Sequence, residues 1–368
     1  MKTFMLTGAT GFVGSALGAR LMASGNAVIA LSRNDPDGSR TRRAVLDAAV
    51  GCGLDISDRM ESGLRVLNAG DGPLADVLDR DVIRDVDVFW HCAAEMTYSS
   101  SKLVHAFRTN VCDTVALYRK LAAQETSCRR FYYVSTAYTA GMRGGDAAEL
   151  LHIGNLCINT YQLTKWCAEQ SLFALHAEQN LPVTIFRPTI VVGHSQSGWT
   201  RRNGFGMYMF VDAINAARRL GITTVRFNLP DDVRPDMVPV DRLVEDMAGL
   251  TFRAAQGAEF EIFQCSGGRE LTTRQVVSTI GETAGVSVEY GAPLTAVEHR
   301  IDRAIDANRP FASTDWAFGR SRLDEALGRR DSRPPVTKAL LERLVTWYRQ
   351  GPDADMRAAH DENPEVAA

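Results

Sequence analysis

The sequence lacks any run of about 18 apolar residues, the length that a membrane-spanning helix requires. It also lacks an excess of one charge, because 41 basic and 44 acidic side chains leave a net charge of −3. Neither a nucleic acid nor an anionic membrane is therefore an expected partner. The apolar start of the chain breaks at Thr7 and has no cleavage-like site, so we do not interpret it as a signal peptide. These absences predict a cytoplasmic protein.

Cysteine and histidine are too scattered to indicate cross-links or a metal centre. The seven cysteines include no CxxC pair, and the seven histidines include no HExxH motif. The cysteine pattern favours a reducing compartment and excludes a disulfide framework. No metal site is predicted.

What the sequence does contain is an alternation of short apolar runs with amphipathic stretches. Continuous apolar strands that alternate with helices are typical of a parallel sheet covered on both faces. The right-handed crossover rule then predicts an α/β fold with a Rossmann-type doubly wound parallel sheet. The expected strands are residues 2–6, 27–31, 86–91, 131–135 and 183–186, and the expected helices are residues 12–23, 39–49, 103–123 and 161–176.

A glycine-punctuated turn follows the first expected strand and opens the first expected helix. Glycines let the backbone approach a pyrophosphate closely, and the free N–H groups of a helix N-terminus attract an anion. A strand before the turn and a helix after it form the context of a dinucleotide-binding site. The expected cofactor-binding residues are Thr7, Gly8, Thr10, Gly11, Phe12, Val13 and Gly14.

The second expected strand ends at Arg33, where an acidic residue would favour NAD by binding the adenosine ribose. A guanidinium instead matches the oxygens of a 2′-phosphate, and Arg40, Arg42 and Arg43 follow nearby. The expected cofactor is therefore NADPH.

Tyr161 and Lys165 are spaced i and i+4, which places them on one face of a helix. The ammonium can then hold the cofactor ribose and lower the pKa of the phenol. Lowering that pKa from about 10 to about 7 requires roughly 4 kcal/mol of preferential phenolate stabilisation. Lys165 and a cationic nicotinamide together are the expected source.

These motifs and four others resemble the extended short-chain dehydrogenases/reductases in their order along residues 1–280. The others are His91-Cys92-Ala93-Ala94, Asn110-Val111, Val134-Ser135-Thr136-Ala137 and Arg187-Pro188-Thr189. The resemblance implies that Thr136 polarises a carbonyl, Tyr161 transfers a proton, Lys165 anchors the ribose, and Asn110 orders a helix and a relay water. Ser135 is the less favoured alternative to Thr136. The resemblance also implies cofactor contacts from Asp71, Ala93, Ala94, Pro188, Thr189 and Ile190.

Residues 159–169, 186–193 and 238–241 are similar, more narrowly, to fatty acyl-CoA reductases and thioester-reductase domains. That likeness implies NADPH-dependent reduction of a CoA- or carrier-bound acyl thioester to an aldehyde or alcohol, with an acyl or peptidyl carrier protein as a partner. The sequence departs from the pattern at His194-Ser195, where Asp-Ser is common, and it contains no adenylation or carrier segment. Oligomeric state is left open.

Regularity loosens after Pro188, where residues 193–205 form an expected loop. Further expected elements are a strand at residues 260–263 and helices at residues 207–220, 272–285 and 336–349. We interpret residues 1–192 as the NADP-binding domain, 193–350 as a smaller substrate-binding subdomain interleaved with it, and 351–368 as a disordered tail. The loop and the helix 207–220 are expected to line the binding site of an acyl chain. The affinity for the substrate should therefore increase with the length of this chain until the cleft is filled.

Other functions remain open. The same fold supports ketone or hydroxysteroid-type dehydrogenases and nucleotide-sugar epimerases or dehydratases, and a non-catalytic NADP sensor is disfavoured by the presence of Thr136, Tyr161 and Lys165. A hydrolase elbow around Ser195 is disfavoured because its final glycine is replaced by Ser197.

Overall fold

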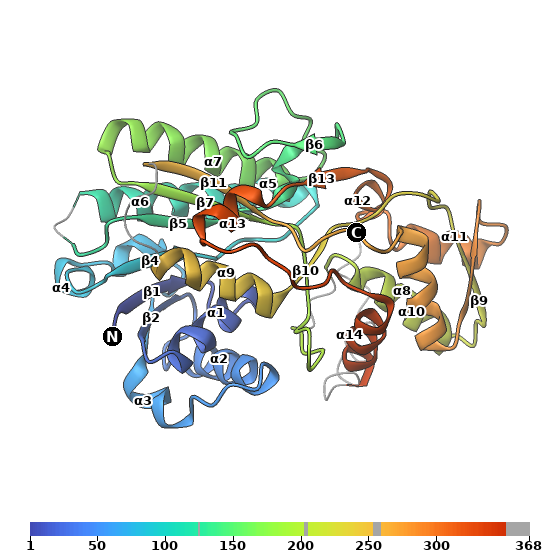
Figure 1. Cartoon of the computed structure of the whole chain (residues 1–368), viewed down its shortest axis with the longest axis horizontal. Helices are drawn as coiled ribbons and strands as arrows, with labels where there is room; N and C mark the ends of the chain where they lie inside the picture. The colour runs from blue at the N-terminus through green and yellow to red at the C-terminus, as the bar shows by residue number, and fades with distance from the viewer. Residues whose placement is uncertain (124–125, 202–204, 253–258, 351–368) are drawn as a thin grey trace.

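A seven-stranded, fully parallel sheet forms the centre of the molecule in the computed structural model, which describes residues 1–123, 126–201, 205–252 and 259–350 (Figure 1). The strand order is β11-β7-β5-β4-β1-β2-β3. The order reverses between β1 and β4, and this is where an open α/β sheet leaves a crevice for a ligand. The strands are β1 (Thr3–Thr7), β2 (Ala27–Ser32), β3 (Leu64–Asn68), β4 (Val88–His91), β5 (Phe131–Val134), β7 (Val183–Pro188) and β11 (Phe260–Cys265).

Helices cover both faces of this sheet, which confirms the predicted doubly wound fold (Figure 1). Successive residues of β1 alternate between the two cores: Phe4 and Leu6 belong to one apolar cluster and Met5 to the other. The first cluster packs α1 (Phe12–Ala23), α2 (Ser39–Gly51) and α9 (Val240–Phe252) below the sheet in the figure, and the second packs α6 (Asp113–Ala122) and α7 (Thr160–Gln179) above it. No helix among the described residues is long and apolar enough to cross a membrane.

The prediction of a single helix over residues 103–123 is wrong. The structure divides it into α5 (Leu103–Phe107), a π-helical turn (Arg108–Cys112) and α6. The turn contains Asn110, whose buried side chain is tied to Glu95 and Thr164 outside this segment. These long-range contacts, which periodicity does not report, favour the local change in helical repeat. The strand β3 was also absent from the sequence prediction.

The remaining elements lie mostly at one end of the sheet, on the right of Figure 1. Small parallel pairs link β8 with β10, β9 with β12 and β6 with β13, whereas β11 returns to the main sheet beside β7. The tail 351–368, predicted to be disordered, lies outside the described residues. The bounds are α3 (Met60–Gly63), α4 (Arg80–Ile83), β6 (Gly145–Ala147), β8 (Ile190–Val192), α8 (Tyr208–Arg219), β9 (Thr224–Phe227), β10 (Met237–Pro239), α10 (Thr273–Ala284), β12 (Ser287–Tyr290), α11 (Ala296–Arg303), α12 (Arg309–Ser313), β13 (Trp316–Phe318), α13 (Ser321–Ala326) and α14 (Lys338–Gln350).

Candidate active site

A cavity of about 430 Å³ lies at the carboxyl ends of the strands, where the strand order reverses. Fifteen of the eighteen residues expected to act in the site line it, and Thr7, Asp71 and Asn110 do not. The lining ones are Gly8, Thr10, Gly11, Phe12, Val13, Gly14, Arg33, Ala93, Ala94, Thr136, Tyr161, Lys165, Pro188, Thr189 and Ile190.

The turn between β1 and α1 forms one wall, and it needs glycine for steric reasons. A Cβ on Gly8 would come within 2.7 Å of the amide nitrogen of Ala93, and Gly8 has a φ of +74°. A Cβ on Gly14 would come within 2.1 Å of the carbonyl oxygen of Gly8. Gly11 caps α1 without a side chain, and the first turn carries no acidic residue. The helix N-terminus therefore points its free N–H groups at the cavity, and this cradle fits a pyrophosphate.

Thr7 lies behind this wall. Its hydroxyl accepts hydrogen bonds from the amides of Cys92 and Ala93, both at 3.1 Å, and is bonded to Nδ1 of His91 at 2.6 Å. His91 is fully buried, and burial lowers its pKa to about 3, so it stays neutral. Thr7 thus shapes the loop after β4 from behind, and its side chain makes no approach to the cavity.

Asn110 also does not line the cavity and lies behind the residues that do. Its Oδ1 accepts from the Glu95 amide at 2.7 Å, while its Nδ2 donates to Oγ1 of Thr164 at 2.9 Å. Thr164 precedes Lys165 on α7. Asn110 therefore connects the π-helical turn to the helix that carries Tyr161 and Lys165.

Arg33 and Arg40 line the part of the cavity next to the carboxyl end of β2. Arg33 pairs with Asp113 and donates from Nε to the Gly72 carbonyl oxygen at 3.3 Å. Burial raises the pKa of Asp113, although the guanidinium of Arg33 opposes that shift. Asp71 instead accepts a hydrogen bond from Asn34 at 2.9 Å and lines a neighbouring groove.

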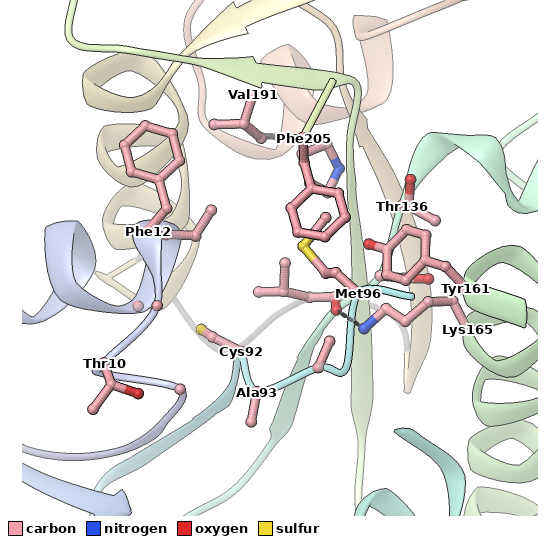
Figure 2. A pocket seen from close by; sticks show the side chains of 18 of the residues that line it. Thr10, Phe12, Cys92, Ala93, Met96, Thr136, Tyr161, Lys165, Val191 and Phe205 are labelled. Carbon is pink, nitrogen blue, oxygen red and sulfur yellow. Dashed lines mark hydrogen bonds between the residues drawn. The ribbon is translucent and has the colours of Figure 1, made fainter. Parts of the chain in front are cut away.

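Thr136, Tyr161 and Lys165 converge on the opposite wall (Figure 2). The N-cap Asn159 accepts a hydrogen bond from the Gln162 amide, so α7 starts at Thr160 and its first turns present Tyr161 and Lys165 on one face. Figure 2 shows the hydroxyl-bearing side chains of Thr136 and Tyr161 side by side. Lys165 extends beneath them and donates from Nζ to the Val134 carbonyl oxygen at 2.5 Å.

Burial governs the protonation of both ionisable groups on this wall. It lowers the pKa of Lys165 to about 7 and raises the pKa of Tyr161 above its usual value near 10. The protein by itself therefore keeps the Tyr161 phenol protonated, which suits a proton donor. The expected lowering of that pKa requires charge beyond what these residues supply.

The neighbouring Ser135 also lines the cavity, and its hydroxyl oxygen is buried without a hydrogen-bond partner among the described residues. Thr136 Oγ1 accepts from the Tyr138 amide at 3.3 Å, which fixes its rotamer beside Tyr161. The Thr136 hydroxyl therefore stands next to the phenol of Tyr161.

Asp236 supports the segment Pro188–Ile190 and was missed by sequence reasoning. It accepts hydrogen bonds from the Thr189 hydroxyl at 2.7 Å, the Ser266 hydroxyl at 2.5 Å and the Gly267 amide at 2.8 Å. Burial raises its pKa, against the effect of these donors. The only sequence signal was a charged residue directly before the apolar strand β10.

A second cavity, of about 80 Å³, adjoins the first. Several of its residues had no role in the sequence analysis, notably Tyr98, Tyr138 and Phe311. Tyr98 follows β4, Tyr138 follows β5 and Phe311 lies in α12, so only the fold brings them together. Their aromatic type was the one available signal, and aromatic residues are usually core.

Ser195 does not form a hydrolytic pair. Its hydroxyl donates to Asp241 Oδ2 at 2.6 Å, while Nδ1 of His194 accepts from the Ser197 amide at 3.1 Å. These bonds close the loop after β8 onto α9, which is a structural role.

Parts of this chain are similar in sequence to a known family and to several known proteins. The family model described as male sterility protein matches residues 6–247. The hybrid PKS-NRPS synthetase poxE of Penicillium oxalicum is 28% identical over 259 residues, which cover 68% of this chain and 6% of that protein. Fatty acyl-CoA reductase 1 of Gallus gallus is 30% identical over 149 residues, which cover 37% of this chain and 28% of that protein. The chain thus spans a small part of these relatives.

Solved structures share the fold. The terminal R domain of the myxalamid PKS-NRPS pathway superposes with a TM-score of 0.73 at 19% identity, over 95% of this chain and 90% of that one. UDP-glucuronic acid 4-epimerase from Bacillus cereus, solved with NAD and a UDP-sugar, gives a TM-score of 0.68 at 16% identity, over 95% of this chain and 99% of that one. At these identities the likeness shows the architecture alone.

Proposed function

The chain belongs to the male sterility protein family, within the extended short-chain dehydrogenases/reductases, and from this membership we propose that it is an NADPH-dependent reductase of acyl thioesters. The substrate is bound to CoA or to an acyl or peptidyl carrier protein, and the product is an aldehyde or alcohol. Curated relatives that carry reductase names support acyl reduction. Residues 1–192 serve mainly the dinucleotide and residues 193–350 mainly the substrate.

One observation carries this proposal most directly. Tyr161 lines both cavities, so it stands where the larger cavity, which fits a dinucleotide, meets a small apolar pocket. A carbonyl at that junction would have its oxygen near Thr136 and Tyr161 and its apolar substituent in the second cavity. A sugar nucleotide would instead need polar partners for its hydroxyls and diphosphate.

The residues of the larger cavity fit a phosphorylated dinucleotide. The Gly8–Gly14 turn suits the pyrophosphate, Lys165 suits a ribose hydroxyl, and Arg33 with Arg40 suits a 2′-phosphate. When bound, NADPH supplies the hydride that the carbonyl carbon receives.

The protein's own groups handle the proton and the leaving group. Thr136 and Tyr161 donate hydrogen bonds to the carbonyl oxygen, and Tyr161 gives it a proton as the carbonyl is reduced. The resulting hemithioacetal then breaks its C–S bond, its hydroxyl proton is lost, and the departing thiolate takes up a proton. One hydride and one proton are consumed, and an aldehyde and a free thiol are formed.

The test measures NADPH consumption and free-thiol release in the same reaction, across acyl-CoA thioesters. Equal amounts of thiol and oxidised cofactor are expected if reduction stops at the aldehyde, and half as much thiol if the alcohol is formed. Aldehydes, hydroxysteroids and UDP-sugars are offered in parallel. NADPH oxidation with only these compounds, and no thiol from any thioester, would refute the proposal and leave the broader oxidoreductase assignment.

A further inference from the structure

The small cavity beside Tyr161 is positioned to select the acyl group. Five residues line both it and the dinucleotide cavity, and these form its mouth: Tyr98, Tyr138, Tyr161, Ile190 and Gly206. Phe311 packs against the first two, with ring centroids 5.8 Å from Tyr98 and 5.1 Å from Tyr138. Three of the five mouth residues are tyrosines, so we call the mouth the aromatic collar, and it includes the proposed proton donor, Tyr161.

The body of the cavity lies beyond this collar and is walled by residues that do not line the larger cavity. Met207 and Phe210 come from the start of α8, whereas Val276 and Val277 come from α10. All four are at most 5% exposed and belong to one apolar core cluster. The body is thus a gap within a packed core, and neighbouring side chains fix its size.

Two of the polar side chains that line the cavity are already hydrogen-bonded to backbone carbonyl groups. The Thr273 hydroxyl donates to the Ala312 carbonyl oxygen at 2.9 Å, and the Asn308 amide donates to the Gly206 carbonyl oxygen. Among the described residues that line the cavity, none carries an acidic or basic side chain. A charged substituent placed there would lose its hydration without gaining an ionic partner. The lining therefore favours an uncharged, apolar group.

Volume limits how large that group can be. The cavity measures about 80 Å³. A dry apolar cavity of about 150 Å³ holds one benzene ring, so about three carbons fill a space of this size. The thiol arm of CoA or of a carrier is much longer and carries amide groups, so the acyl end is the part of a thioester that fits.

We propose that this cavity is the acyl pocket and that it restricts the enzyme to short, uncharged acyl chains, with butanoyl at the optimum. The inference rests on the proposed thioester reduction and narrows it from acyl groups in general to this class. Val276 and Ala312 are two lining residues whose substitution changes the volume of the cavity. Longer chains would have to displace the core of α8 and α10.

The experiment uses acyl-N-acetylcysteamine thioesters from acetyl to decanoyl, with thiol release as the readout. Up to the optimum, kcat/KM is expected to rise about fourfold per methylene, from the transfer free energy of each group, and then to fall. Val276→Ala removes two carbons from the wall and should move the optimum two carbons longer. The matched control is Val225→Ala, a buried valine of the same cluster that does not line the cavity, and it should leave the optimum unchanged.

Two further comparisons sharpen the test. Ala312→Leu adds three carbons and should abolish the advantage of butanoyl over acetyl while NADPH binding, followed by its fluorescence, stays intact. A 3-aminopropanoyl thioester is nearly isosteric with butanoyl and differs by one positive charge, so it should react at least about a hundredfold more slowly because the pocket offers no counter-charge.

The outcomes separate the two proposals. No thiol from any thioester would overturn the reductase proposal and the pocket with it. Thiol release with an optimum at decanoyl, an unchanged optimum in Val276→Ala, or a preference for the 3-aminopropanoyl chain would overturn the pocket assignment alone.

Discussion

Replacing Arg33 with alanine is expected to change two properties at once. The guanidinium faces the dinucleotide cavity, and it also pairs with the carboxylate of Asp113. The side chains of Arg33 and Asp113 are 28% and 4% exposed, so the variant leaves a nearly buried carboxylate without its cationic partner.

The magnitudes follow from these contacts. Charge-assisted hydrogen bonds to a 2′-phosphate contribute about 1.5–3 kcal/mol, which corresponds to a preference for NADPH over NADH of roughly ten- to a hundredfold. Leaving the Asp113 carboxylate without its cationic partner should lower the free energy of unfolding by about 1–3 kcal/mol. Without Arg33 the pKa of Asp113 rises further, so the native state takes up a proton at higher pH than the unfolded chain. The stability deficit is then largest near neutral pH and shrinks as the pH falls.

The assay combines fluorescence titration with NADPH and NADH and urea unfolding of three proteins: the unmodified chain, Arg33→Ala, and the double variant with Asp113→Asn. The double variant should recover stability but not NADPH preference, because a neutral amide no longer needs a cation. Equal affinity of the unmodified protein for the two cofactors, or an unchanged preference in Arg33→Ala, would refute the role of Arg33.

Three other changes probe the same cavity. Tyr161→Phe should reduce turnover by a factor of about 10²–10⁴ with unaltered NADPH affinity in titrations, and near-normal turnover would remove Tyr161 from the mechanism. The pKa of Lys165 near 7 predicts that NADPH affinity falls as the pH rises above 7, since the bound anion favours the ammonium. Titrations of Lys165→Met should show no such fall, and a persisting one would assign it to another group. Gly14→Ala forces a Cβ against the carbonyl oxygen of Gly8 and should weaken NADPH binding at least about tenfold. Gly319→Ala, where a Cβ meets nothing within 4 Å, is the control, and equal binding by both variants would argue against the cradle.

Local chemistry was readable from the sequence. The Gly8–Gly14 turn depends on backbone geometry within a few residues, and Tyr161 and Lys165 are one helical turn apart. The apolar strands are continuous because both faces of the sheet are covered, which leaves a pattern in the chain itself. For these reasons the fold class and fifteen of the residues that line the larger cavity could be predicted.

Tertiary structure decided what depends on distant partners. Arg33 meets Asp113 across 80 positions, and Thr189 meets Asp236 across 47. The π-helical turn at Asn110 arises where a regular helix was expected, because that side chain bonds to the loop at Glu95 and to Thr164 on α7. The hydrophobic periodicity of a segment depends on that segment alone, so it does not predict contacts with residues far away in the chain.

The second cavity is the feature that depends most on tertiary structure. Its collar includes residues that follow β4 and β5, against which Phe311 packs, and its body joins residues at the start of α8 to residues of α10. Each of these side chains reads in the sequence as an ordinary apolar or aromatic core position. A cavity is volume that no side chain fills, so it is fixed by the packing of several elements at once and by no single stretch of sequence. The sequence determined the fold and supplied the residues proposed to bind a dinucleotide and to donate a proton, and the packing of residues far apart in the chain decided the size of the second cavity.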